Sequence, residues 1–402
     1  MTPVEVHGTC DPAYSSVLEE FARNFAERGE VGASVHVTVD GERVVDLWGG
    51  TADAGRPWEA DTLVCVYSCT KGIVALAAHL LVDRGLLDLE ALVSDYWPEY
   101  GCAGKERTTV RMLLDHSAGV PAVHAAVQPG DMYDGDVMAG YLAEQRPWWE
   151  PGTRNGYHLV SFGWTIGEVI RRVTGLTIGE FIAKELAGPL GADFHLGLPE
   201  ELEGRVASSV EWVPGPEWVP TPYVQKVLED PSSVQAVAIA NVIASGVDVN
   251  TRAFRAAEMG GMGGISSARG LAALYAPLAA GGGDLVSADA VVRMGQPAVA
   301  TSEDALLLIP TRFSLGFMTS MDNRRRGPRA AGSSAVLGAS AFGHVGKGGS
   351  IGFADPSAKL AFSYVMNQHG EGILLNDKGQ SLVDATYRSL GYRTDAPGVW
   401  TP

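Results

Sequence analysis

The spacing of hydrophobic residues over the first fifty positions predicts a helix followed by a β-hairpin. Residues 12–28 carry apolar side chains at every third or fourth position, which is the period of an amphipathic helix. Two runs rich in β-forming residues follow, at 33–39 and 44–48. Between them stands Asp40-Gly41, a pair typical of tight turns that join antiparallel strands.

The pattern then changes to one that is mainly helical. Residues 70–84 are non-polar around most of a helical circumference, which is typical of a buried helix. From 109 to 191 helical spacing dominates, most clearly at 160–173 and 178–185. Residues 211–223 contain four prolines and two tryptophans, so we expect an irregular loop there.

The last third of the chain returns to β-structure. A helix is predicted at 268–280, strand–turn–strand at 342–366 with a strand at 360–366, and an amphipathic helix at 382–390. Strands at both ends of a chain can share one sheet when the helical middle is inserted between them. The pattern therefore predicts an α+β fold with a cleft where the helical region meets the sheet.

Composition and charge exclude several classes of function. The 402 residues carry a formal net charge of −17, so we expect neither nucleic acid nor an anionic membrane as a partner. The longest uncharged apolar stretch, 72–82, is too short to cross a bilayer. The start of the chain lacks the features of a signal peptide, and four cysteines do not form a disulfide scaffold. These features predict a cytoplasmic protein with reduced thiols.

Metal and nucleotide sites have little support in the sequence. The nine histidines form no H-E-x-x-H or similar zinc pattern, and there is no phosphate-binding G-x-x-x-x-G-K-[ST] loop. We therefore expect no metal and no cofactor.

A G-x-S-x-G pattern centred on Ser350 suggests the nucleophile elbow of α/β-hydrolases. That motif needs a strand-to-helix turn in a large parallel sheet. Here turn-forming residues follow at 353–356, and too few residues remain to complete such a sheet. We therefore interpret this segment as a glycine-rich turn between antiparallel strands.

The strongest candidate for chemistry is Ser68-Cys69-Thr70-Lys71, at the start of the predicted buried helix. A serine one turn before a lysine places both side chains on one helical face. Burial lowers the pKa of a lysine, and a neutral amine can accept the serine proton. Of the lysines, only Lys71 has a serine three residues before it.

Two more segments could complete a nucleophilic site. Tyr157 follows Pro151-Gly152-Thr153 in a predicted turn, where its phenol could share a proton with Lys71, although a purely structural role is the alternative. Residues 342–349 are glycine-rich, so a backbone N–H there could pair with that of Ser68 as an oxyanion hole.

Taken together, these motifs resemble the serine β-lactamase-like superfamily, and most closely class C β-lactamases and family VIII carboxylesterases. They are Ser68-x-x-Lys71, Tyr157 in P-G-T-x-x-x-Y, and G-H-x-G-x-G-G-S-x-G-F-A-D-P at 343–356. Residues 113–121 are also similar to the family's L-L-x-H-T-S-G-L-P, and 266–271 (S-S-A-R-G-L) adds a supporting segment.

The resemblance implies roles for individual residues. Ser68 would be the acylated nucleophile, with Lys71 and Tyr157 as the proton-transfer pair. His344-Val345-Gly346 falls where the family has its K-T-G box, so His344 and Gly346 would lie at the substrate. The N–H groups of Ser68 and Lys347 would form the oxyanion hole.

The resemblance also implies one catalytic domain over 1–402, of the β-lactamase and penicillin-binding-protein type. A mixed α/β lobe would comprise about 12–67 and 262–402, with an antiparallel sheet flanked by the terminal helices. An all-helical lobe would comprise about 68–261.

Two departures from the class C pattern bear on the substrate. Leu159 occupies the position of an asparagine that contacts the acylamino group of β-lactams, and His344 replaces a permanently charged lysine. The expected activity is therefore carboxylesterase hydrolysis of a neutral small-molecule ester. Three alternatives stay open: an acyltransferase or amidase using the same acyl-enzyme, a β-lactamase, and a non-catalytic binding protein.

Overall fold

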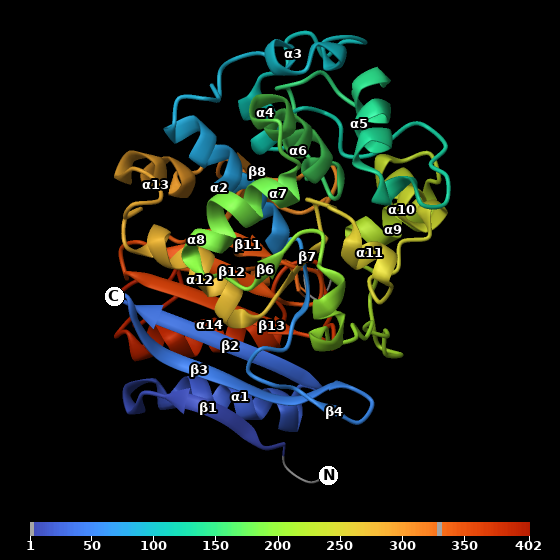
Figure 1. Ribbon diagram of the computed structural model, residues 1–402. Coiled ribbons are helices and arrows are strands. Elements are labelled where there is room, and N and C mark those ends of the chain that lie inside the picture. The colour runs from blue at the N-terminus through green and yellow to red at the C-terminus, as the bar shows by residue number, and fades with distance from the viewer. Residues whose placement is uncertain (1–3, 328–331) are drawn as a thin grey trace.

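One antiparallel sheet joins the two ends of the chain in the computed structural model, which describes residues 4–327 and 332–402 (Figure 1). Along the sheet the strand order is β1-β3-β2-β13-β12-β11-β10-β9-β8, and β4 pairs with β3 outside that path. The strands are β1 (Val6–Cys10), β2 (Gly32–Val39), β3 (Glu42–Asp53), β4 (Arg56–Pro57), β8 (Val299–Thr301), β9 (Thr311–Phe313), β10 (Met318–Thr319), β11 (Phe342–Val345), β12 (Ile351–Asp355) and β13 (Leu360–Met366).

The predicted hairpin lies near the β1 edge of this sheet. β2 and β3 pair antiparallel on either side of Asp40-Gly41, where both residues have positive φ. β13, from the other end of the chain, pairs with the free edge of β2 and brings Phe362 opposite Val37. The predicted α+β architecture, with strands from both chain ends in one sheet, is thus confirmed.

The two faces of the sheet pack against different helices. Leu360, Phe362 and Tyr364 of β13 belong to one hydrophobic cluster, together with residues of α1 (Ser15–Glu27) and α14 (Asp377–Ser389). Ala361 and Val365 project from the opposite face into a second cluster that includes α12 (Ala268–Ala279). This alternation is the period of two expected of a strand covered on both sides.

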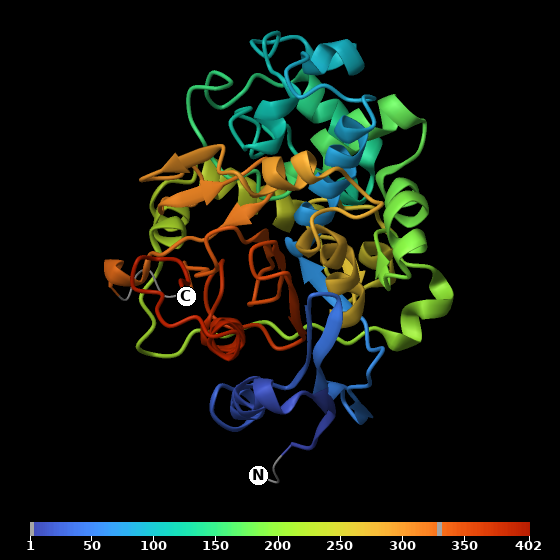
Figure 2. The same cartoon turned by 90° about the vertical axis from the view of Figure 1, so that its left-hand side faces the viewer.

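The middle of the chain forms a helical region above the sheet, seen from a second side in Figure 2. At its centre is α2 (Cys69–Asp83), whose residues from Cys69 to Leu81 are buried, which explains its apolar circumference. The other helices are α3 (Val93–Tyr96), α4 (Val110–Leu114), α5 (Gly135–Glu144), α6 (Ser161–Thr174), α7 (Ile178–Ile182), α8 (Gly188–Leu190), α9 (Pro222–Glu229), α10 (Val234–Ser245), α11 (Arg252–Ala256) and α13 (Ala288–Gly295).

A second sheet connects the helical region to the rest of the molecule. Its order is β5-β7-β6, from β5 (Val64–Tyr67), β7 (Gly264–Ser266) and β6 (Phe194–His195). Short 3-10 segments lie at Pro12–Tyr14, Pro98–Tyr100, Asp131–Tyr133, Glu200–Arg205 and Arg324–Arg326, and a π-helical segment at Ala183–Ala187.

Two sequence predictions need correction. The irregular segment predicted at 211–223 ends earlier, because Thr221 caps a helix that begins at Pro222, a residue well suited to a first helical turn. The segment 342–366 contains three strands rather than two. By contrast, the G-x-S-x-G pattern is confirmed as a turn between antiparallel strands β11 and β12, with Gly348 and Gly349 at positive φ.

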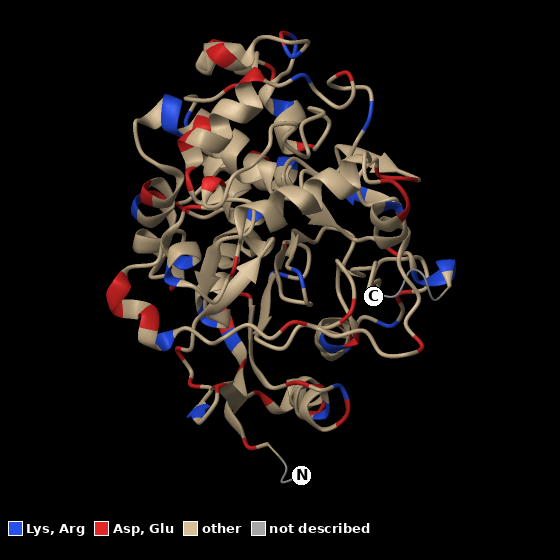
Figure 3. Cartoon of the chain, turned by 90° about the vertical axis from the view of Figure 1, so that its right-hand side faces the viewer, with Lys and Arg blue, Asp and Glu red and all other residues tan. Residues whose placement is uncertain are grey.

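Charged residues of both signs are interspersed over the molecule (Figure 3). Among the described residues, no helix combines the length and hydropathy that crossing a membrane requires.

Candidate active site

Ser68 lies where β5 turns into α2. It is the N-cap residue of that helix, and Tyr67 before it has φ +45°. A positive φ at a bulky non-glycine residue is strained, and such strain is typical of functional sites. The turn therefore holds the Ser68 hydroxyl and backbone N–H at the positive end of the α2 dipole.

Lys71 is completely buried beneath Ser68. Its Nζ lies 3.0 Å from Ser68 Oγ and donates to the carbonyls of Leu159 and Gly261, each at 2.7 Å. Burial lowers the pKa of this amine well below its usual value. A neutral amine has two hydrogens, which the two carbonyls accept, so its lone pair would face the Ser68 hydroxyl.

Tyr157 approaches the same two side chains from the segment before α6. Lys71 Nζ lies 4.8 Å from the centre of its ring, and its hydroxyl interacts with Ser68. Burial raises the pKa of the phenol, and the Ser68 contact only partly opposes this. Tyr157 therefore keeps its proton at neutral pH and can donate it.

Asp304 holds the backbone of Tyr157 in place. Both carboxylate oxygens accept from the Tyr157 N–H at 3.0 Å, and one also accepts from Leu306 and Leu307 at 2.8 Å. Burial raises the pKa of Asp304 to about 6. Sequence reasoning missed this residue, since its one signal is an acidic side chain directly before an apolar run at 305–309.

The glycine-rich segment after β11 lies beside the start of α2. A Cβ at Gly346 would stand 2.3 Å from the Val66 carbonyl oxygen, so only glycine permits this approach. The Gly346 N–H donates to Ser350 O at 2.7 Å and is therefore occupied. Within the described chain, the Lys347 N–H donates to no backbone carbonyl, which leaves it available to a ligand.

His344 is a residue of β11, directly before this segment. Its buried ring is 6.0 Å from that of Tyr157, with Nδ1 2.7 Å from the Val345 carbonyl. Burial lowers the pKa of His344 to about 3, so the ring is neutral at pH 7. The expected direct contact of His344 with substrate stays a prediction, and the geometry places its ring against Tyr157 instead.

Comparison with known proteins agrees with this geometry. The family model described as Beta-lactamase matches residues 19–382. The chain belongs to the beta-lactamase family.

Two similar proteins are named as esterases, and a third is named EstA. "Esterase/beta-lactamase LipL" of Mycobacterium tuberculosis (strain ATCC 25618 / H37Rv) is 32% identical over 92% of this chain and 85% of its own length. The crystal structure of a family VIII carboxylesterase has 39% identity and a TM-score of 0.82, covering 96% of this chain and all of the other. EstA from Arthrobacter nitroguajacolicus Rue61a has 32% identity and a TM-score of 0.80, covering 95% and 98%.

In this beta-lactamase-family protein, Ser68 and Tyr157 open into a cavity of about 600 Å³. Leu159 lines it too, with a hydrocarbon side chain. Many of the other lining side chains are apolar or aromatic, among them Trp212, Trp218, Tyr223, Ile239, Met262 and Ile309. Such a lining suits an apolar ligand with few polar groups.

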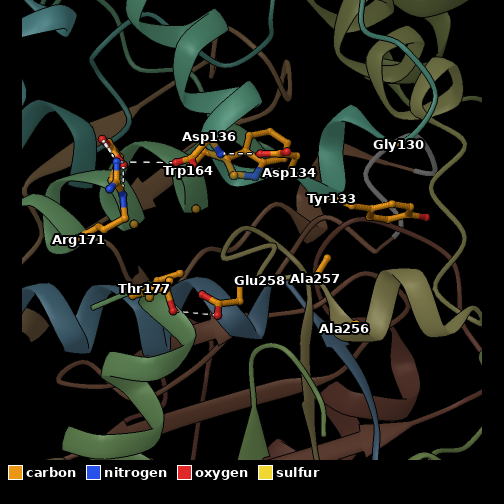
Figure 4. Close-up of a pocket in the computed structure, with 15 residues that line it drawn as sticks. Gly130, Tyr133, Asp134, Asp136, Trp164, Arg171, Thr177, Ala256, Ala257 and Glu258 are labelled. Carbon is orange, nitrogen blue, oxygen red and sulfur yellow. Dashed lines mark hydrogen bonds and ion pairs between the residues drawn. The ribbon is translucent and has the colours of Figure 1, made fainter. Parts of the chain in front are cut away.

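A second cavity, of about 500 Å³, lies within the helical region (Figure 4). Its polar groups are already paired: Glu258 accepts from Thr177 Oγ1 at 2.9 Å and from Gly179 N at 2.8 Å, and Arg171 donates to Glu168. It contains none of the predicted site residues. The cavity at Ser68 is therefore the candidate active site.

Proposed function

We propose that this protein is a serine carboxylesterase that hydrolyses neutral, largely apolar esters through an acyl-enzyme on Ser68. The observation that carries this proposal is the buried Lys71 amine, which is bonded to two carbonyls and lies 3.0 Å from Ser68 Oγ. Ser68 in turn lines a cavity with many apolar side chains. The esterase names of its relatives support the same reaction.

The first half-reaction forms the acyl-enzyme. Lys71 takes the Ser68 proton while Ser68 Oγ bonds to the ester carbonyl carbon. The carbonyl oxygen becomes negative beside the N–H groups of Ser68 and Lys347. The bond to the alcohol then breaks, and the leaving oxygen receives a proton from Tyr157, which Lys71 in turn reprotonates.

The second half-reaction releases the acid. A water molecule gives a proton to the Lys71–Tyr157 pair and its oxygen bonds to the acyl carbon. The bond between Ser68 Oγ and the acyl carbon then breaks, and Ser68 Oγ takes back a proton from Lys71. The proposed mechanism uses side chains and backbone N–H groups of the chain itself and needs no cofactor. Among the described residues, no cluster of histidine, cysteine or acidic side chains is suited to a metal ion.

The organisation and location predicted from the sequence are part of this proposal. The chain would work as one catalytic domain, with a mixed lobe over about 12–67 and 262–402 and a helical lobe over about 68–261. A cytoplasmic location is supported by the four cysteines, all of which are free thiols. The substrate would be a small-molecule ester, without nucleic acid or membrane as partner.

Intact mass spectrometry after incubation with a fluorophosphonate tests the proposal. The wild-type protein should gain one phosphonyl adduct and hydrolyse p-nitrophenyl butyrate. Ser68→Ala should gain no adduct and lose at least about a thousandfold in kcat/KM. Ser350→Ala is the matched control, because Ser350 is a buried serine in the β11–β12 turn outside the cavity. Loss of the adduct in Ser350→Ala but not in Ser68→Ala would refute the assignment.

A further inference from the structure

An ion pair stands at the rim of the Ser68 cavity, next to the proposed oxyanion hole. Lys347 Nζ lies 2.8 Å and 2.7 Å from the two carboxylate oxygens of Glu211. Both residues line the cavity, and their side chains are 52% and 61% exposed. A substrate entering the cavity therefore passes both charges.

The backbone on each side fixes this pair in place. Val210 N donates to Asn367 O at 2.8 Å, and His369 N donates to Val210 O at 2.9 Å. These bonds hold the residue before Glu211 against the segment that follows β13. His369 Nδ1 lies 3.4 Å from Glu211 Oε2. Lys347 Nζ also lies 5.6 Å from the centre of the Tyr67 ring.

Glu211 stays ionised at neutral pH. The neighbouring His369 ring and the hydrogen bonds from Lys347 lower the pKa of its carboxyl to about 2, against the opposing effect of burial. The positive charge of Lys347 is thus matched by the negative charge of Glu211, and both Glu211 carboxylate oxygens accept from the Lys347 ammonium.

The remaining charges on the cavity wall are negative. Asp248 and Glu371 also line it, and among the described lining residues Lys347 is the one lysine or arginine. With Lys347 matched by Glu211, an entering carboxylate would meet two acidic side chains and, among the lining residues that the structure describes, no unpaired cation. The carboxylate of a substrate inside the cavity would be repelled by these acidic side chains, and water and salt would weaken the repulsion only in part.

We propose that Glu211 is a specificity-determining residue that neutralises Lys347 and so makes the enzyme discriminate against esters that carry a carboxylate. The inference rests on the proposed esterase function and names the substrate class that the site rejects. Without Glu211, the Lys347 ammonium would stand free beside the nucleophile and attract an anionic acyl group.

Two esters that differ in one group test the inference. p-Nitrophenyl valerate and mono-p-nitrophenyl glutarate have acyl chains of equal length, ending in a methyl group and a carboxylate. The readout is the ratio of kcat/KM for glutarate to kcat/KM for valerate. In Glu211→Gln this ratio should rise about tenfold over wild type, and 0.5 M NaCl should shrink the rise.

Glu217→Gln is the matched control. Glu217 belongs to the same loop and is exposed, but it does not line the cavity. Removing its charge should leave the ratio within about twofold of wild type, since water and salt screen an exposed charge outside the cavity. An equal rise in both variants would mean that overall charge, not the Lys347 pair, sets the preference, and would overturn the inference.

Two Lys347 variants separate a freed cation from a loosened loop. Lys347→Gln alone keeps the backbone N–H but leaves Glu211 unmatched, so the ratio should fall below wild type. Glu211→Gln combined with Lys347→Gln should return the ratio to about the wild-type value. If the double variant keeps the tenfold rise, Glu211 acts by holding the loop, and the inference is wrong.

The two levels of proposal fail in different ways. A wild-type protein that neither hydrolyses valerate nor gains a phosphonyl adduct would refute the esterase function itself. A wild-type protein that hydrolyses valerate, with the same ratio in all these variants, would refute only the role of Glu211. Thermal unfolding of each variant confirms that the ratios compare folded proteins.

Discussion

Burial, rather than opposite charge, sets the protonation of the residues around Ser68. The pKa of Lys71 is lowered by loss of solvent, and so are those of His116, His158 and His344. The rings of His116 and His344 lie 5.0 Å and 6.0 Å from that of Tyr157. These neutral histidines add no positive charge near Ser68, so in the proposed mechanism Lys71 is the group whose protonation decides the reaction.

The pH dependence of the reaction should follow Lys71. The lowered pKa keeps the amine unprotonated, and active as a base, down to the folded-state pKa. As pH falls through that value, Lys71 gains a proton and kcat/KM should fall. Lys71→Arg cannot lose its proton, so it should lose at least about a hundredfold in kcat/KM and show no such decline. The measurement is hydrolysis of p-nitrophenyl butyrate from pH 5 to 9 by pH-stat.

Lys184→Arg provides the comparison for this experiment, because Lys184 is an exposed lysine of the helical region. Its profile should match wild type. Near wild-type turnover in Lys71→Arg would instead limit Lys71 to an electrostatic role.

At the scale of elements, a contact between two backbones positions both carbonyls that hold Lys71. A Cβ at Gly163, in the first turn of α6, would stand 2.1 Å from Gly261 N, and one at Gly261 would stand 2.3 Å from Val160 O. Glycine at these positions lets α6 lie directly on the Gly260–Gly261 turn. The Leu159 and Gly261 carbonyls thereby converge on one amine.

Gly163→Ala should push α6 away from the Gly260–Gly261 turn. Forcing a methyl group into a packed backbone contact costs about 1–3 kcal/mol in free energy of unfolding. A shift of the Gly261 carbonyl by about 1 Å could lower kcat/KM by up to about a hundredfold. Urea unfolding and p-nitrophenyl butyrate kinetics measure the two effects.

Gly167→Ala, one turn later on α6, is the matched variant. Its Cβ would meet Ile178 Cγ2 at 3.4 Å, an ordinary contact. Because alanine favours helices, the change should leave the free energy of unfolding unchanged or raise it by up to about 1 kcal/mol. The kcat/KM for p-nitrophenyl butyrate should be unchanged. Equal losses in both variants would show that any added methyl group on α6 is harmful.

At the scale of the whole molecule, the two ends of the chain are joined beneath the sheet. Glu30, just after α1, contacts Lys378 of α14 at 3.2 Å and the Tyr364 hydroxyl of β13. All three side chains are buried. Burial raises the pKa of Glu30, and Lys378 opposes that rise.

Lys378→Met should leave Glu30 buried without its partner. The expected loss is about 3–5 kcal/mol in free energy of unfolding at pH 7.5. The pKa of Glu30 would rise further in this variant. When the folded-state pKa of a carboxyl is raised, its contribution to the stability of the folded protein is fully present below the unfolded-state pKa. That contribution is lost as pH rises through the folded-state pKa. The loss should therefore be smaller at pH 5, as urea unfolding at both pH values would measure.

Lys359→Met removes a lysine from an exposed pair with Asp40, at 2.8 Å. Such pairs contribute about 0–1 kcal/mol, so this variant should unfold close to wild type. If Lys378→Met lowered the free energy of unfolding as little, the pairing of Lys378 with Glu30 would not be what stabilises the buried carboxyl.

The sequence by itself determined the features that depend on neighbouring residues. The three-residue spacing of Ser68 and Lys71 on a buried helix, the hairpin at Asp40-Gly41 and the turn around Ser350 all follow from local periodicity and turn chemistry. Local rules suffice there because residues within one turn of helix or one hairpin are in contact by covalent geometry alone.

Only the tertiary structure decided which distant groups complete the site. Asp304 meets Tyr157, the Gly261 carbonyl meets Lys71, and Glu211 meets Lys347, each across more than a hundred residues of chain. It also placed the His344 ring 6.0 Å from that of Tyr157 and outside the lining of the cavity. No local spacing encodes these contacts, because they depend on how the two chain ends close one sheet around the inserted helices and on which face of each backbone is then buried.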